Sequence, residues 1–100
     1  MILLYDGTFE GFLSLVYEVY YKKLKPTKIY KTLPNEILFE EILEINSSKE
    51  SGIKVLNAIK TKFPKEILEK ILNIFMCDSK EFEMALLEYI VIGFKDSKQL

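Results

Sequence analysis

The chain has 100 residues, the length of one domain, and its 49% hydrophobic and 29% charged residues suffice for one core with a polar surface. The formal net charge is −1 and all 14 basic residues are lysines, so neither a global positive field nor an arginine fork attracts nucleic acid. The apolar runs are only a few residues long and the amino terminus lacks the basic flank of a secretory signal, so we expect a cytoplasmic protein with no membrane span.

The first part of the chain predicts a strand, a turn and an apolar helix. Residues 2–5 are apolar and favour a short edge or buried strand, which the turn pair Asp6-Gly7 stops. Thr8 then caps a helix that carries Glu10 in its first turn and that Pro26 ends. The helix has a stripe of apolar side chains at helical spacing, which we assign to the core: Phe9, Phe12, Leu13, Val16 and Tyr20.

Two weaker strands are expected in the middle of the chain. Residues 28–33 are weakly strand-like, and residues 41–46 favour a strand over a helix begun at Pro34 because a helix start follows at once. That start lies at Ser47, which has capping-box spacing to Glu50.

Three amphipathic helices complete the predicted fold. The first runs to about residue 62, the second has Pro64 in its first turn, and a capping box over residues 78–81 opens the third, which Gly93 ends. The side chains expected to face the core are, helix by helix, Ile53, Leu56, Ile59 and Phe63; Ile67, Leu68, Ile71, Leu72 and Phe75; and Phe82, Ala85, Leu86, Tyr89 and Ile90. We therefore predict an α+β fold, mostly helical with about four helices, packed with a small two- or three-stranded sheet in a single domain over residues 1–100.

The clearest candidate binding segment runs from Tyr20 to Lys31 and holds five lysines and three tyrosines without an acid. Lysines contact phosphates and release counterions, while tyrosines stack on the bases of a single strand. The residues assigned to this nucleic-acid contact are Lys22, Lys23, Lys25, Lys28, Lys31, Tyr21 and Tyr30. The alternative, which the sequence alone favours, is a solvated helix end whose lysines complement the helix dipole and whose tyrosines pack on the core. Tyr17 and Tyr21 then remain for a partner surface.

The other chemistry-bearing residues do not form a catalytic set. Glu36, Glu40, Glu41 and Glu44 have neither the spacing of a calcium loop nor a nearby histidine, so we interpret them as a solvent face and predict no metal. The turn Asp6-Gly7-Thr8 offers backbone donors to an anion, but one glycine falls short of a phosphate-binding loop, and turn and helix cap are its expected roles. Cys77 is the only cysteine and, with no histidine base in the chain, is expected to be a small packing residue. No cofactor is implied, and only a carboxylate mechanism stays open for catalysis by this chain.

The run YDGTFEGFLSLVYEVYYKK resembles the amino-terminal signature of a bacterial family labelled "probable DNA metabolism protein", which begins with a strand, a Tyr-Asp-Gly-Ser/Thr-Phe-Glu-Gly turn and an aromatic-rich helix. The runs LFEEILEINSSKESGIKVLNAI and EFEMALLEYIVIGF are similar to its later blocks. The resemblance implies a role beside a radical-SAM DNA modification or repair protein, and some relatives carry this region fused to a uracil-DNA-glycosylase-like domain. Family members are usually longer, with a His- and Arg-containing carboxy-terminal segment that has no counterpart here. The resemblance therefore implies the amino-terminal part of a longer protein or a truncated member.

The leading hypothesis is an accessory, non-catalytic domain of a DNA modification or repair system. It would bind the radical-SAM or glycosylase-like partner through exposed apolar surface and contact nucleic acid weakly. One alternative is a fragment of a DNA-processing enzyme whose catalytic residues lie outside this chain, and another is a protein-interaction domain unrelated to DNA. A homodimer is a further way to cover the apolar last helix.

Overall fold

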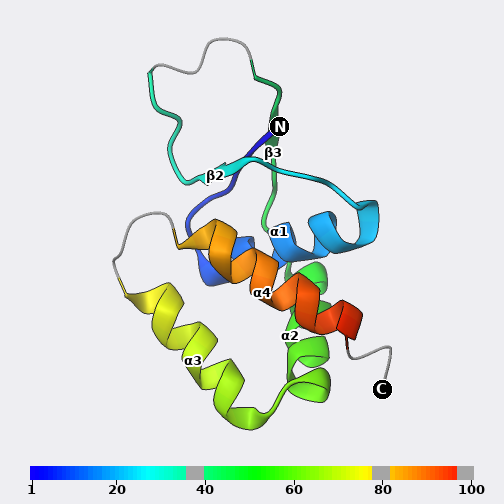
Figure 1. Ribbon diagram of the computed structural model, residues 1–100. Helices are drawn as coiled ribbons and strands as arrows, with labels where there is room; N and C mark the ends of the chain where they lie inside the picture. The colour runs from blue at the N-terminus through cyan, green and yellow to red at the C-terminus, as the bar shows by residue number, and fades with distance from the viewer. Residues whose placement is uncertain (36–39, 78–81, 97–100) are drawn as a thin grey trace.

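Three short strands and four helices make up the computed structural model, which describes residues 1–35, 40–77 and 82–96 (Figure 1). In chain order they are β1 (Ile2–Leu4), α1 (Phe9–Lys22), β2 (Lys28–Tyr30), β3 (Ile42–Glu44), α2 (Lys49–Lys62), α3 (Lys65–Met76) and α4 (Glu83–Asp96). The sheet lies at one end of the group of helices (Figure 1). The predicted α+β class, with a small sheet and mostly helical structure, is confirmed.

The sheet is parallel, and β1 is its central strand, in the order β2-β1-β3. Leu3 pairs with Ile29 on one side and with Leu43 on the other, and it is fully buried. Beyond the strand ends the ladder continues, because the amide of Tyr5 donates to the carbonyl of Tyr30 at 3.0 Å. Since the strands are parallel, their carboxyl ends meet at one edge of the sheet. This edge lies beside the start of α1.

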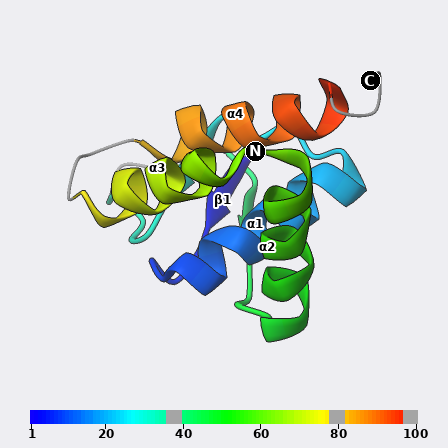
Figure 2. The ribbon, with the colours of Figure 1, turned by 90° about the horizontal axis from the view of Figure 1, so that it is seen from below.

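Helix α1 is the most deeply buried helix, and its aromatic side chains are largely core residues as predicted. Every residue from Gly11 to Val16 is buried. Phe12 packs against the sheet side, with its ring centroid 6.1 Å from that of Tyr5, and the helix also packs against α2 and α4. Seen from below, α2 lies across α1 (Figure 2). Contact on more than one side explains why apolar residues spread well beyond one stripe of this helix.

The two ends of α1 are capped in different ways, the start by a side chain and the end by a residue in the left-handed conformation. Thr8 caps its start, as predicted, by accepting a hydrogen bond from the amide of Gly11. The prediction that Pro26 ends the helix is wrong, because Lys23 adopts the left-handed conformation (φ 53°) and ends it first. The amide of Leu24 then bonds back to the carbonyl of Val19 at 3.1 Å, a carbonyl that also accepts from the amide of Lys23.

Several predicted positions in the last three helices are shifted. Ser48 rather than Ser47 caps α2, by accepting from the amide of Ser51 at 3.2 Å, and Pro64 occupies the cap position of α3 rather than its first turn. The capping box at 78–81 lies outside the described residues. Within α2, Ile53 is 48% exposed and the buried residues are Gly52, Val55 and Ile59.

In α4 the buried face is also rotated from the prediction. Ala85 and Tyr89 are exposed, whereas Leu87 and Phe94 are buried beside Phe82, Leu86 and Ile90. Helix α4 is apolar on most of its surface, so the spacing of its residues does not select one face. Packing against α1, α2 and β2 selects it instead.

The prediction that Gly93 ends the last helix is wrong, since α4 continues to Asp96. A Cβ at Gly93 would overlap the ring of Phe63, which projects from the end of α2. The same ring stacks on Tyr89 with 5.9 Å between centroids. Gly93 is therefore a site of close approach between α2 and α4.

The substitution Gly93→Ala is expected to destabilise the fold by about 1–3 kcal/mol, because over-filling a packed contact forces neighbouring side chains to shift. Gly52→Ala is the matched control, since a Cβ there meets its nearest neighbour, Cγ of Glu10, at an ordinary 3.5 Å. The control is expected to leave stability unchanged or raise it by up to about 1 kcal/mol, because alanine favours a helix interior over glycine. Urea unfolding followed by circular dichroism measures both, and an equal loss in the two variants would contradict the close-approach role.

The buried hydroxyl of Ser14 links α1 to α2 by hydrogen bonds. Ser14, which is 1% exposed, accepts from the amide of Ser48 at 2.8 Å and donates to the carbonyl of Glu10 at 2.9 Å. The hydroxyl of the neighbouring Ser47 donates to the carboxylate of Glu10, one turn before Ser14 in α1, at 2.8 Å. The start of α2 is thus fixed to one face of α1.

Ser14→Ala is expected to cost about 1–3 kcal/mol of stability, because it leaves the partly buried amide of Ser48 without its acceptor. Ser47→Ala removes an exposed hydrogen bond of similar length and should change stability by no more than about 0.5 kcal/mol. Comparing their unfolding free energies tests the link, and faster hydrogen exchange at the Ser48 amide should accompany the Ser14 change. A Ser14 variant as stable as wild type would show that this hydroxyl is dispensable.

Candidate functional site

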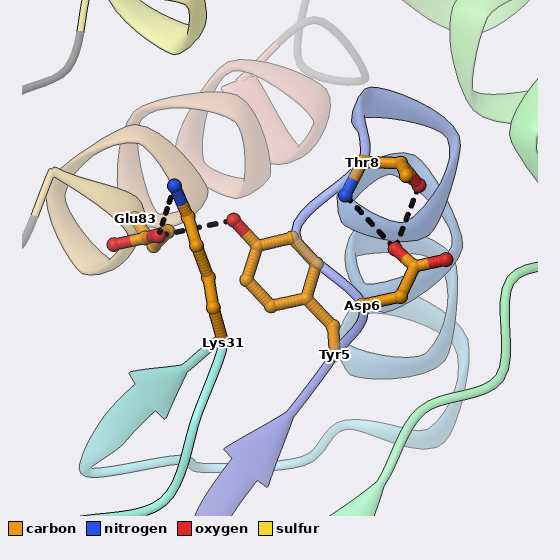
Figure 3. Close-up of polar contacts among 5 residues, drawn as sticks. All are labelled: Tyr5, Asp6, Thr8, Lys31 and Glu83. Carbon is orange, nitrogen blue, oxygen red and sulfur yellow. Dashed lines mark hydrogen bonds and ion pairs between the residues drawn. The ribbon is translucent and has the colours of Figure 1, made fainter.

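The turn that follows β1 is a capping structure, as predicted. Oδ1 of Asp6 accepts from the amide of Thr8 at 2.9 Å and from its hydroxyl at 2.6 Å (Figure 3). Gly7 has φ 84°, a conformation that favours glycine. These hydrogen bonds, first the one from the hydroxyl, lower the pKa of Asp6 below its ordinary value. Because Asp6 already uses the Thr8 amide, this turn does not offer that donor to an external anion.

A buried polar network lies at the carboxyl edge of the sheet. Tyr5 follows β1, Lys31 follows β2, and Glu83 is the first residue of α4 (Figure 3). The hydroxyl of Tyr5 donates to Oε2 of Glu83 at 3.0 Å, and Nζ of Lys31 lies 4.0 Å from the same oxygen. Glu83 is only 5% exposed, so these two neighbours replace part of the water that its side chain loses on burial. The network joins the ends of two strands to the start of the last helix.

Burial of the phenol, together with its hydrogen bond to Glu83, raises the pKa of Tyr5 far above its ordinary value. The hydroxyl therefore stays protonated and acts as a donor. Glu83 was not among the predicted site residues, because an acid in the first turn of a helix is usually exposed and complements the dipole. The signal available was Tyr5 itself, since a tyrosine at the end of a buried strand needs a partner for its hydroxyl.

The structure divides the predicted lysine and tyrosine segment. Lys22 forms an ion pair with Glu18 at 2.8 Å on the exposed side of α1. Lys31 belongs to the Glu83 network and Tyr30 is half-buried on β2. The remaining members are exposed, and they are Tyr21, Lys23, Lys25 and Lys28.

Three lysines meet in one pocket, which we call the lysine groove. Its volume is about 570 Å³, and it is lined by Tyr20, Tyr21, Lys23, Lys25 and Lys95 over a floor of Val19, Leu24 and Val91. Tyr21 is 63% exposed and contacts Tyr20 edge to face, with 5.3 Å between ring centroids. Lys95 comes from α4 and was not part of the predicted set. None of the lining side chains that the structure describes is acidic.

A smaller pocket, which we call the Glu83 pocket, lies toward the other end of α4. We call the contact between α4 and the segment that leads from α1 into β2 the seam, and both pockets lie along it. The Glu83 pocket holds about 240 Å³ and is lined by Thr27, Lys28, Ile29, Tyr30, Glu83 and Met84. Both pockets therefore lie between the segment that leads from α1 into β2 and helix α4. Glu83 and Lys95 stand at opposite ends of that helix, a separation of about 18 Å along its axis at 1.5 Å per residue.

A third pocket, the apolar groove, lies between α3 and α4. It holds about 390 Å³ and is lined by Ile67, Lys70, Ile71, Ile74, Phe82, Ala85, Leu86 and Tyr89. Ile74 and Tyr89 are about half exposed there. This groove provides the exposed apolar surface that the sequence predicted in general terms.

The remaining candidates do not join these sites. Glu40, Glu41 and Glu44 are exposed, and Glu36 lies outside the described residues. Over residues 1–35, 40–77 and 82–96, no three His, Cys, Asp or Glu side chains are grouped to hold a metal. Cys77 ends α3 and is exposed, so its prediction as a packing residue is wrong.

Comparison with models of protein families, with curated proteins and with solved structures finds no match for the chain. None of the helices in the described part of the chain has the length and apolar character needed to cross a membrane.

Tyr5→Phe tests the buried network. At neutral pH it should cost about 1–3 kcal/mol, because Glu83 loses its buried donor. Because the pKa of Tyr5 is raised in the folded protein, its hydroxyl contributes stability that is fully present below the unfolded-state pKa of about 10 and is lost as the pH rises above it. The stability difference between wild type and variant should therefore shrink above about pH 10. Urea unfolding at a series of pH values measures it, and a difference that stays constant or grows there would contradict the network.

Proposed function

We propose that this chain is an accessory domain of a DNA modification or repair system and binds single-stranded nucleic acid weakly in the lysine groove. The observation that carries the proposal is the convergence of Lys23, Lys25 and Lys95 beside the exposed ring of Tyr21. Two of these lysines come from the end of α1 and one from the end of α4.

The physical basis is phosphate contact combined with base stacking. Each lysine that neutralises a phosphate releases counterions, and a tyrosine face stacks on any base. Lysine contacts a phosphate as a point charge without the bidentate geometry of arginine. A net charge of −1 adds no long-range attraction, so the proposed binding is weak and strongly dependent on salt.

The same lysines have a second effect, since they complement the partial negative charges at the carboxyl ends of α1 and α4. A purely structural role would explain their positions without a ligand. The ring of Tyr21 packs against Tyr17, with 4.5 Å between centroids, yet the residue is 63% exposed, and the part of the ring left in water beside the lysines favours the binding role.

The resemblance of the opening run to a family of DNA metabolism proteins supports the DNA context. It suggests a radical-SAM or glycosylase-like protein as the partner, within the cytoplasm, and the apolar groove is the surface we propose for that contact. Co-purification from cells would test the partner, and recovery of neither type of protein with the intact chain would count against this part of the proposal. Catalytic residues, if the system needs them, would come from that partner or from further chain.

The groove is tested by replacing Lys23, Lys25 and Lys95 together with glutamine. Loss of the three contacts should weaken binding of a labelled oligothymidine strand at least about tenfold at low salt and reduce the salt slope by about 2, since each phosphate contact on a single strand contributes about 0.7 to the slope. Fluorescence anisotropy across a salt series measures both.

The matched control replaces Lys49, Lys60 and Lys65, which are exposed on α2 and α3 and change the net charge equally. Its affinity should stay close to that of wild type. If the two triple variants weaken binding to the same degree, the effect is one of total charge and the lysine groove is not the binding site.

A further inference from the structure

Glu83 is buried, and it also lines a pocket. Its Oε2 accepts the hydrogen bond of the Tyr5 hydroxyl and lies 4.0 Å from the ammonium of Lys31, while its second oxygen points away from both (Figure 3). No buried side-chain oxygen or nitrogen of the described residues lacks a hydrogen-bond partner, so this second oxygen keeps contact with solvent. Glu83 lines the Glu83 pocket, which gives that oxygen its access. Among the described residues no hydrogen bond to this second oxygen is found, so it is the acceptor of Glu83 that is left for a ligand.

The opposite wall of the pocket is β2, the edge strand of the sheet, with Tyr30 and Lys28. A volume of about 240 Å³ is below the roughly 300 Å³ at which pockets for drug-sized ligands begin. The space suits one planar ring rather than a larger molecule. Lys28 adds a positive charge at the same wall, where a phosphate attached to such a ring would be neutralised.

We infer that the Glu83 pocket takes one nucleobase of the strand held in the lysine groove and that Glu83 selects guanine. The inference rests on the proposed function, because the two pockets lie along one seam beside α4. An ionised carboxylate only accepts hydrogen bonds. Guanine presents two adjacent donors, N1–H and the 2-amino group, which can both reach the one open oxygen, whereas the N3–H of thymine is flanked by two carbonyls. Adenine and cytosine place an acceptor nitrogen beside their amino group, which a carboxylate repels.

The neighbours of Glu83 suit this role. Tyr5 and Lys31 hold one oxygen in place, so the second is fixed before any ligand arrives and little side-chain entropy is lost on binding. Removal of a base from a stack into a pocket, and its recognition by hydrogen bonds to the pairing edge, is the usual way in which proteins read single-stranded bases.

The test compares two labelled short oligonucleotides, one entirely thymidine and one with a single central guanine, with the full chain and its Glu83→Gln variant. Wild type is expected to bind the guanine strand about tenfold more tightly, within the range that one base-specific pair provides. Replacing guanine by hypoxanthine, which lacks the 2-amino group, should remove part of that preference. In the Glu83→Gln variant the ratio of the affinities for the guanine strand and the thymidine strand should fall to near one, because the amide presents a donor as well as an acceptor.

The variant keeps an acceptor for the Tyr5 hydroxyl, and a thermal melt checks that it is folded. Glu88→Gln, the same change on an exposed position of α4, should keep the full preference. Equal binding of both strands by wild type, or a preference that survives in Glu83→Gln, overturns the inference and leaves the lysine groove intact. If neither strand binds, the proposed function fails and this inference fails with it.

Discussion

The burial of α1 between the sheet and the other helices is the constraint on which this fold depends. Strands of three residues cannot hold together alone, and here α1 covers them with Phe12 and its buried neighbours. Because residues 11–16 are all buried, the helix must also be covered by α2 and α4. Helix α4 packs against both α1 and α2. Its contact with α2 is close, because Phe63 at the end of α2 is inserted against Gly93 of α4. The position of α4, and therefore every pocket described above, follows from these contacts.

Hydrogen bonds fix the places where hydrophobic packing alone would allow sliding. The Ser14–Ser48 contact sets where α2 begins relative to α1, and the Tyr5–Glu83 contact sets where α4 begins relative to the sheet. The second is buried and the first is partly buried, so losing one partner leaves the other unpaired and at least partly desolvated. Such contacts add little net stability but penalise alternative arrangements strongly. They give a small core a definite geometry.

The functional proposals follow from the seam between α4 and the segment that leads into β2. One end of the seam collects lysines because two helices end there, and the other end holds a carboxylate because two strands and a helix start meet there. Opposite charges about 18 Å apart along α4 suit a ligand with a phosphate backbone and hydrogen-bonding rings. The apolar groove between α3 and α4 is separate from this seam and is suited to a protein partner.

The sequence by itself determined the features that depend on near neighbours along the chain. The Asp6-Gly7 turn, the Thr8 cap, the helical spacing and the α+β class could all be predicted, because each needs only a few adjacent residues. The tertiary structure decided which side of α4 is buried, since an almost wholly apolar helix has no preferred face until Phe63 and α1 contact it. Tertiary contacts also determine which residues make up the candidate sites, because Glu83 lies 78 residues from Tyr5 along the sequence and Lys95 is likewise distant from Lys23. No local pattern records a contact between residues that only folding brings together.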